Sequence, residues 1–160
     1  MRRLAGLLLL ALALPAGAGG FPDPGPRDLC PVCGMVVSKY PAWTATLVYP
    51  DGHARHFDGA KDLFKYLFDP KRYEPGRGHR ATDIARIAVT EYYGLGRIDA
   101  RQAWFVAGSD VLGPMGHELI PLASRADAEE FMRDHQGRRL LRFEEIKREL
   151  PAKLDAGRFD

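Results

Sequence analysis

The sequence contains few cysteines: only Cys30 and Cys33 occur among its 160 residues. Two cysteines three positions apart cannot form the disulfide framework that holds many small secreted proteins together. The fold must therefore depend on a hydrophobic core, and the apolar fraction of 46% is ordinary for a globular protein. We expect the two thiols to have a local role.

A long hydrophobic run is also missing. The apolar run at residues 4–14 falls well short of the roughly 20 residues that a membrane-spanning helix needs, and no later stretch approaches that length. Because Arg2 and Arg3 precede this run and small residues follow it, the pattern is typical of a secretory signal peptide. We expect no transmembrane segment and a periplasmic location.

The N-terminal region divides into two predicted segments. Residues 1–18 form the signal peptide, with cleavage after Ala18, and residues 19–29 form a flexible linker. An uncleaved anchor is the alternative. No cysteine follows Ala18 directly, so we expect no lipobox.

An excess of charge is missing as well. Of the 23 Lys and Arg residues, Arg2 and Arg3 lie in the predicted signal peptide, and the others balance the 21 Asp and Glu residues. Phosphate binding depends on clustered positive charge, so we expect no nucleic-acid partner. The sequence also lacks a Ser-His-Asp arrangement, a phosphate-binding glycine loop and a nucleotide motif. No enzyme class is indicated.

The remaining sequence predicts an α+β fold. Alternation, turn residues and helical spacing indicate strands at 43–49, 53–57, 84–92, 103–106, 119–122 and 140–143. The same signals indicate helices that begin at Asp58-Gly59 and after Ser124, and a last helix at 144–154 that Pro151 interrupts. Residues 71–83 and 108–118 are predicted to be loops.

Both halves follow the order strand, strand, helix, strand, and each helix carries a phenylalanine, Phe64 or Phe131. We interpret this as a degenerate internal duplication that gives two small ββαβ lobes. The predicted lobes are residues 30–96 and 97–160.

The motif Cys-Pro-Val-Cys-Gly-Met at 30–35 places two thiols and a thioether on one short turn. Such ligands select soft ions such as Cu(I), and zinc sites rarely use methionine. Cys30, Cys33 and Met35 are therefore candidate copper ligands, although Met35 would equally suit the first core position of a strand. We expect the preceding linker to leave Cys30 less fixed than Cys33.

A second motif, Gly-Pro-Met-Gly-His-Glu at 113–118, places Met115 between glycines that leave it little packing of its own. Met115 and His117 are further candidate ligands, and a loop-filling role for either is the alternative. One Cu(I) needs two or three soft ligands, so we expect Met115 to lie close to Cys33. We interpret Asp58 as a helix start and Glu118 as loop bracing.

Together these motifs resemble the NosL family. The matching blocks are residues 30–37, 39–41, 56–66, 104–120, 128–131 and 142–146. The resemblance implies a two-lobed fold related in topology to the organomercurial lyase MerB. It also implies a metallochaperone, not an enzyme, that binds Cu(I) in the periplasm for delivery to apo nitrous oxide reductase and its assembly factors.

Carried over by position, the resemblance implies Cys33 and Met115 as ligands, with Met35, Cys30 and His117 as further candidates. Family members are often lipoproteins, and this sequence departs from them because it shows no lipobox. An alternative function remains open: a periplasmic thiol-disulfide reductant that uses Cys30 and Cys33. Binding of one Cu(I) would favour the chaperone, and cycling between dithiol and disulfide would favour the reductant.

Overall fold

The computed structural model describes residues 20–76 and 80–160, so the predicted signal peptide at 1–18 lies outside the described residues. The strands are β1 (Ala45–Val48), β2 (Ala54–Phe57), β3 (Arg86–Thr90), β4 (Arg97–Asp99), β5 (Trp104–Gly113), β6 (Gly116–Leu122) and β7 (Arg139–Arg142). The helices are α1 (Ala60–Phe68), α2 (Pro70–Tyr73), α3 (Arg125–Asp134) and α4 (Leu150–Asp155).

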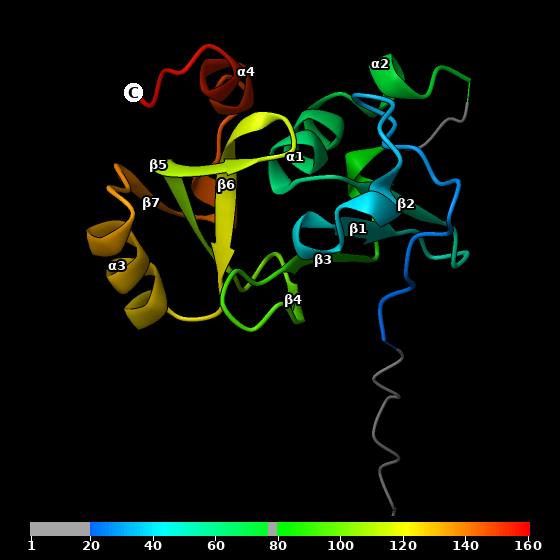
Figure 1. Cartoon of the computed structure of the whole chain (residues 1–160). Coiled ribbons are helices and arrows are strands. Elements are labelled where there is room, and N and C mark those ends of the chain that lie inside the picture. The colour runs from blue at the N-terminus through cyan, green and yellow to red at the C-terminus, as the bar shows by residue number, and fades with distance from the viewer. Residues whose placement is uncertain (1–19, 77–79) are drawn as a thin grey trace, which may run out of the picture.

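These elements form two antiparallel sheets. The first has the order β2-β1-β3-β4 and the second β6-β5-β7. Helix α1 contacts β1 and β2 of the first sheet and β6 of the second, so it lies where the two lobes meet (Figure 1). Helix α3 packs against all three strands of the second sheet.

The predicted two-lobed α+β fold is confirmed. In the first lobe β1, β2, α1 and β3 occur in that order, with the short helix α2 between α1 and β3, and in the second β5, β6, α3 and β7 occur in the corresponding order. Strand β4 pairs with β3 through Val89 and Ile98, so the first sheet extends beyond residue 96.

The central strand of the first sheet is β1, and its composition explains why. All four of its residues, Ala-Thr-Leu-Val, are buried, and Leu47 pairs with Arg55 on one side and Ile87 on the other. β-branched side chains suit such a doubly paired position. The turn into β2 closes at Gly52, whose φ of +84° is readily accessible to glycine.

The predicted loop at 108–118 was wrong. Strand β5 continues to Gly113 and β6 begins at Gly116, so only Pro114 and Met115 remain as a two-residue turn. The glycines that indicated a loop lie instead within the register shift between Ala107 and Leu112 and on either side of the two-residue turn. Gly116 has a φ of +80°, as a tight hairpin turn requires.

The last predicted helix was too long. Residues Phe143–Glu145 form one 3₁₀ turn, and α4 begins only at Leu150. Pro151 stands in the first turn of α4, where its missing N–H costs no hydrogen bond. The proline therefore starts this helix and does not interrupt one.

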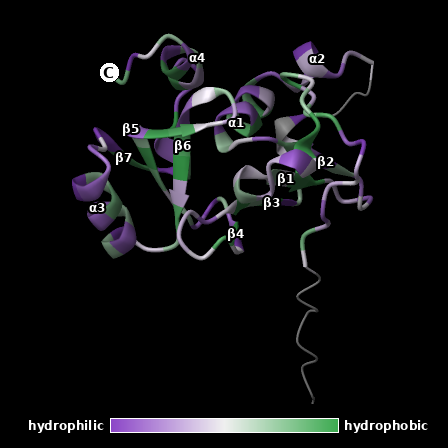
Figure 2. Ribbon diagram, in the orientation of Figure 1, coloured by the Kyte–Doolittle hydropathy of each residue, from purple (hydrophilic) through white to green (hydrophobic). Residues whose placement is uncertain are grey.

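One hydrophobic core joins the two lobes. The Phe64 ring of α1 packs against Phe105 of β5 and against Phe143, with ring centroids 5.4 and 5.0 Å apart. A second, smaller cluster under α3 contains Val106, Ile120, Leu122, Ala128 and Phe131. Hydrophobic residues concentrate on β1, β5 and β6, whereas α3 is largely hydrophilic on its outer surface (Figure 2). Within residues 20–76 and 80–160, no helix has the length and apolar character needed to cross a membrane.

Phe131→Ala should lower the stability of the second lobe. The side chain is fully buried and its ring packs edge-on against Tyr92 at 4.8 Å. Truncation of a buried Phe leaves a cavity and costs about 3–5 kcal/mol. Thermal unfolding should show a lower melting temperature while the expected Cu(I) stoichiometry stays the same. Loss of copper without loss of stability would contradict a purely structural role.

Candidate metal site

The cysteine motif forms a tight and ordered turn. The Cys30 N–H donates to the Met35 carbonyl, and the Gly34 N–H donates to the Cys30 carbonyl, both at 2.8 Å. Gly34 has a φ of +79°, which its lack of a Cβ permits. Cys30 is only 1% exposed, so the expectation that the preceding linker leaves it less fixed than Cys33 was wrong.

Two buried carboxylates face this turn. The Cys33 thiol donates to Asp58 Oδ1 at 3.2 Å, and the Cys30 thiol donates to Asp62 Oδ2 at 3.5 Å. One ligand atom from each of these four residues lies within 4.8 Å of the others. The second oxygen of Asp58, Oδ2, is buried and has no hydrogen-bond partner among the described residues. The cluster is therefore a preformed set of four donors that a metal ion would complete.

The helix predicted to begin at Asp58-Gly59 begins at Ala60, but the Asp58 side chain does not cap it. Gly59 occupies the N-cap of α1 and no side chain next to it caps the helix. The N-terminus of α1 is instead satisfied from β6, because Glu118 Oε1 accepts a hydrogen bond from the Lys61 N–H at 2.5 Å. A Cβ at position 59 would collide with that carboxylate, which explains the glycine. Asp58 is thus free to accept from Cys33.

Sequence reasoning missed both carboxylates as part of the site. Asp58 lies directly after β2, and Asp62 lies in the first turn of α1. Their position around the start of an apolar helix was the one available signal, but Asp58 precedes the N-cap, so helical spacing does not relate the two side chains. Nothing in the sequence showed that this side faces the cysteine turn.

Burial controls the ionisation of the two thiols. It raises the pKa of Cys33 to about 12, and the hydrogen bond to Asp58 adds to the increase. Burial raises the pKa of Cys30 further, with the charges of Asp58 and Asp62 acting in the same direction. Both thiols are protonated at neutral pH in the metal-free protein and donate to the carboxylates. A bound cation would favour the thiolates and release these protons.

The hairpin of β5 and β6 reaches the same end of α1. The Lys61 ammonium donates to the Met115 carbonyl at 2.7 Å and also pairs with Asp155 at 2.9 Å. Lys61 is adjacent to Asp62, so the turn that carries Met115 is fastened to the helical turn that carries part of the thiol site. Met115 itself is 42% exposed.

The other two predicted ligands lie at the borders of this region. Met35 follows the cysteine turn and is half-buried. His117 lies on β6, its ring packs edge-on against Phe159 at 4.9 Å, and its buried Nδ1 has no hydrogen-bond partner in the described parts of the chain. The structure thus joins Cys30 and Cys33 with two carboxylates, and places Met115 and His117 on the hairpin that packs against α1.

Comparison with known proteins identifies relatives. Residues 23–151 match the NosL family. The copper-binding lipoprotein NosL of Stutzerimonas stutzeri is 32% identical over 124 residues, which cover 77% of this chain and 64% of that protein. This chain therefore spans less than two thirds of that relative's length. The crystal structure of the copper chaperone NosL from Shewanella denitrificans matches with a TM-score of 0.66 and 27% identity, covering 79% of this chain and 94% of that one.

Glu118 should make the metal-free protein less stable at alkaline pH. Burial raises the pKa of its carboxyl from 4.5 to about 8, although the Leu119 and Lys61 N–H groups oppose this by hydrogen bonding. Between these two values the folded protein keeps a proton that the unfolded chain loses. Stability therefore falls with rising pH, by up to about 1.4 kcal/mol per pH unit.

Urea unfolding of the wild type and of Glu118→Gln should reveal this dependence. The amide cannot ionise, so the variant should gain stability relative to the wild type from about pH 5 to about pH 8. An equal difference between the two proteins at both pH values would show that Glu118 keeps an ordinary pKa.

Proposed function

This chain belongs to the NosL family, and from that premise we propose that it is a periplasmic metallochaperone for Cu(I). The observation that carries the proposal is the cluster of Cys30 and Cys33 with two buried carboxylates, whose ligand atoms lie within 4.8 Å of one another. Thiolates are soft ligands that favour Cu(I). The receiving protein we propose is nitrous oxide reductase with its assembly factors.

The types of ligand atom in the cluster indicate which metal ion would compete with Cu(I) for the site. Two thiolates and two carboxylates would place four negative charges around one ion, and a divalent tetrahedral ion such as Zn(II) accepts Cys and Asp ligands. We propose that Cu(I) binds through sulfur, with Met115 completing the thiolates. Asp58 and Asp62 then serve as hydrogen-bond acceptors for the thiols of the metal-free protein.

Exposure of the proposed ligands suits a protein that hands its metal over. Cys30 is buried, Cys33 is half-buried and Met115 is 42% exposed. A partner can therefore replace the outer ligands first, while the inner thiolate still holds the ion. This gradient supports transfer of copper without any catalysed reaction.

The thiol-disulfide reductant is the weaker alternative. A reactive Cys-x-x-Cys pair uses a thiolate with a lowered pKa. In this protein burial and the neighbouring carboxylates raise the pKa of both thiols. The same environment suits a site in which a cation replaces two protons.

Metal titration tests the proposed function. The reduced protein should bind one Cu(I), and bind it more tightly than Zn(II), in competition with a chelator for each ion. Because binding displaces protons from Cys30 and Cys33, the apparent Cu(I) affinity should rise with pH, by up to about a hundredfold per pH unit for two protons. Tighter binding of Zn(II) would instead indicate a zinc protein.

The Asp58→Asn variant distinguishes Cu(I) binding from Zn(II) binding in the same titration. Loss of this charge removes one cause of the raised thiol pKa, so apparent Cu(I) affinity should stay the same or increase. Zn(II) affinity should fall if the carboxylate is a zinc ligand. A large loss of Cu(I) affinity would show that Asp58 is itself a copper ligand.

Cys33→Ser and Met115→Ala should each weaken Cu(I) binding by at least about tenfold, or ~1.4 kcal/mol. Neither change should unfold the protein, because both residues lie on turns and neither is fully buried. Met132→Ala on α3 is the matched control, since it removes a thioether from the second lobe and should leave copper affinity unchanged. Cys30→Ser should also weaken binding, because Cys30 is held as firmly as Cys33.

X-ray absorption of the copper-loaded protein gives a direct readout. Metal–sulfur bonds near 2.3 Å allow two sulfurs on one ion to be no more than about 5 Å apart. Loss of one sulfur neighbour in Met115→Ala would agree with Met115 as a ligand. An unchanged spectrum would limit the site to the cysteine turn.

A further inference from the structure

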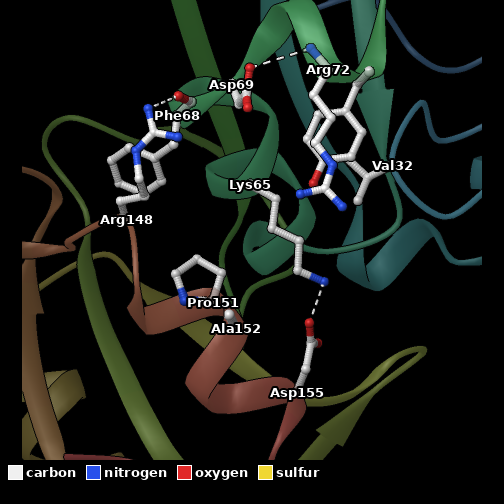
Figure 3. A pocket seen from close by; sticks show the side chains of 10 residues that line it. Val32, Lys65, Phe68, Asp69, Arg72, Arg148, Pro151, Ala152 and Asp155 are labelled. Atoms are coloured by element: carbon white, nitrogen blue, oxygen red, sulfur yellow. Dashed lines mark hydrogen bonds and ion pairs between the residues drawn. The ribbon is translucent and has the colours of Figure 1, made fainter.

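A pocket of about 370 Å³ opens between α1, α2 and α4, next to the cysteine turn (Figure 3). Val32, which directly precedes Cys33, forms part of its wall together with Phe68. Three cationic side chains, Lys65, Arg72 and Arg148, reach it from three different helices or their flanks. We call it the Arg72–Arg148 pocket.

The two guanidinium groups of this pocket have no carboxylate partner among the described residues. Arg148 donates to the Phe68 carbonyl and lies 5.8 Å from the centre of the Phe68 ring. Arg72 lies over the ring of its neighbour Tyr73, 5.6 Å from the ring centre. Both guanidiniums are exposed parts of the pocket wall and keep donors available for a ligand.

Both carboxylates of the pocket already have partners, and one of these partners, Lys65, belongs to the pocket itself. Asp69 caps α2 by accepting a hydrogen bond from the Arg72 backbone N–H. Asp155 pairs with Lys61 at 2.9 Å and with Lys65 at 2.8 Å. The lining has three cationic and two anionic side chains, a net charge of +1, and the cations without a carboxylate partner among the described residues are the two guanidinium groups.

We propose that the Arg72–Arg148 pocket docks a carboxylate side chain from an acidic segment of the protein that exchanges copper with this chain. Guanidinium groups bind carboxylates through two parallel N–H donors, which gives orientation as well as affinity. The apolar parts of the wall, Val32 and Phe68, would cover the methylene groups of a glutamate. This inference rests on the proposed copper function.

The position of the pocket is the reason for assigning a copper-exchanging partner to it. The Lys65 ammonium lies 3.0 Å from Asp62 Oδ1, and the other oxygen of Asp62 accepts from the Cys30 thiol. A carboxylate that enters the pocket would lie next to Lys65. The ion pair between Lys65 and Asp62 would then connect that carboxylate to the candidate metal site. A protein docked there has its own ligands within reach of the more exposed Cys33.

The test uses an acidic probe peptide, with four glutamates around a leucine, and NMR spectra of the ¹⁵N-labelled metal-free protein. Amide shifts should concentrate in α1, α2 and the first turn of α4. The same peptide with glutamines in place of glutamates should bind at least about tenfold more weakly. Shifts spread evenly over the basic surface would overturn the proposal.

Arg72→Gln and Arg148→Gln should each lower peptide affinity by about tenfold. Arg125→Gln on α3 is the matched control, because Arg125 is an exposed arginine on the second lobe and away from the pocket. Equal affinity of all four proteins, wild type included, would overturn the proposal. Succinate that binds as tightly as the peptide would also overturn it, by showing a site for small organic acids.

The same variants separate this proposal from the copper function. Peptide binding to the metal-free protein does not require copper, so failure of Cu(I) binding would leave a pocket that still takes the peptide. Conversely, a protein that binds Cu(I) tightly but fails to bind the acidic peptide would keep the copper function and lose the docking site. Copper affinity in Arg72→Gln and Arg148→Gln should match the wild type.

Discussion

The arrangement of the whole site depends on one buried contact, in which the Glu118 carboxylate of β6 accepts the Lys61 N–H at the start of α1. The first N–H groups of a helix have no partner within the helix, and here the acceptor for one of them comes from the other lobe. The contact fixes α1 between the two sheets and requires the glycine at position 59. It also brings the hairpin turn at Met115 to the Lys61 side chain.

Once α1 is fixed, its first turn determines what the cysteines meet. Asp62 points at Cys30, and Asp58, relieved of a capping role, accepts from Cys33. Burying two carboxylates and two thiols is costly although Lys65 pairs with Asp62, and the Asp58 oxygen without a partner among the described residues is part of that cost. A bound ion would offset it, so metal binding and stability should be linked. This free-energy cost of burial is concentrated where the proposed metal would bind.

Most of the fold could be predicted from local patterns in the sequence, whereas the candidate site could be predicted only in part. Ser124 marked the start of a helix correctly because side-chain capping is a local effect. The hairpin at 113–116 did not follow, because glycines serve loops and tight turns alike. Asp58 was misread for a related reason: its partner is a thiol 25 residues away, and the helix cap comes from a residue 57 positions from Lys61. Contacts of that range leave no periodic signal in a single sequence.

The protonation of the metal-free site explains how the proposed carrier can both hold and release copper. Without a bound ion each thiol holds its own proton and donates a hydrogen bond to a carboxylate that is already in place. The cysteine turn is kept closed by its backbone hydrogen bonds in the metal-free protein, where the thiol–carboxylate hydrogen bonds would stand in for the proposed metal bonds. In the proposed carrier, copper release would therefore be coupled to proton uptake at Cys33 and Cys30. Because Cys33 is half-buried and Cys30 is 1% exposed, a partner would reach the Cys33 sulfur first.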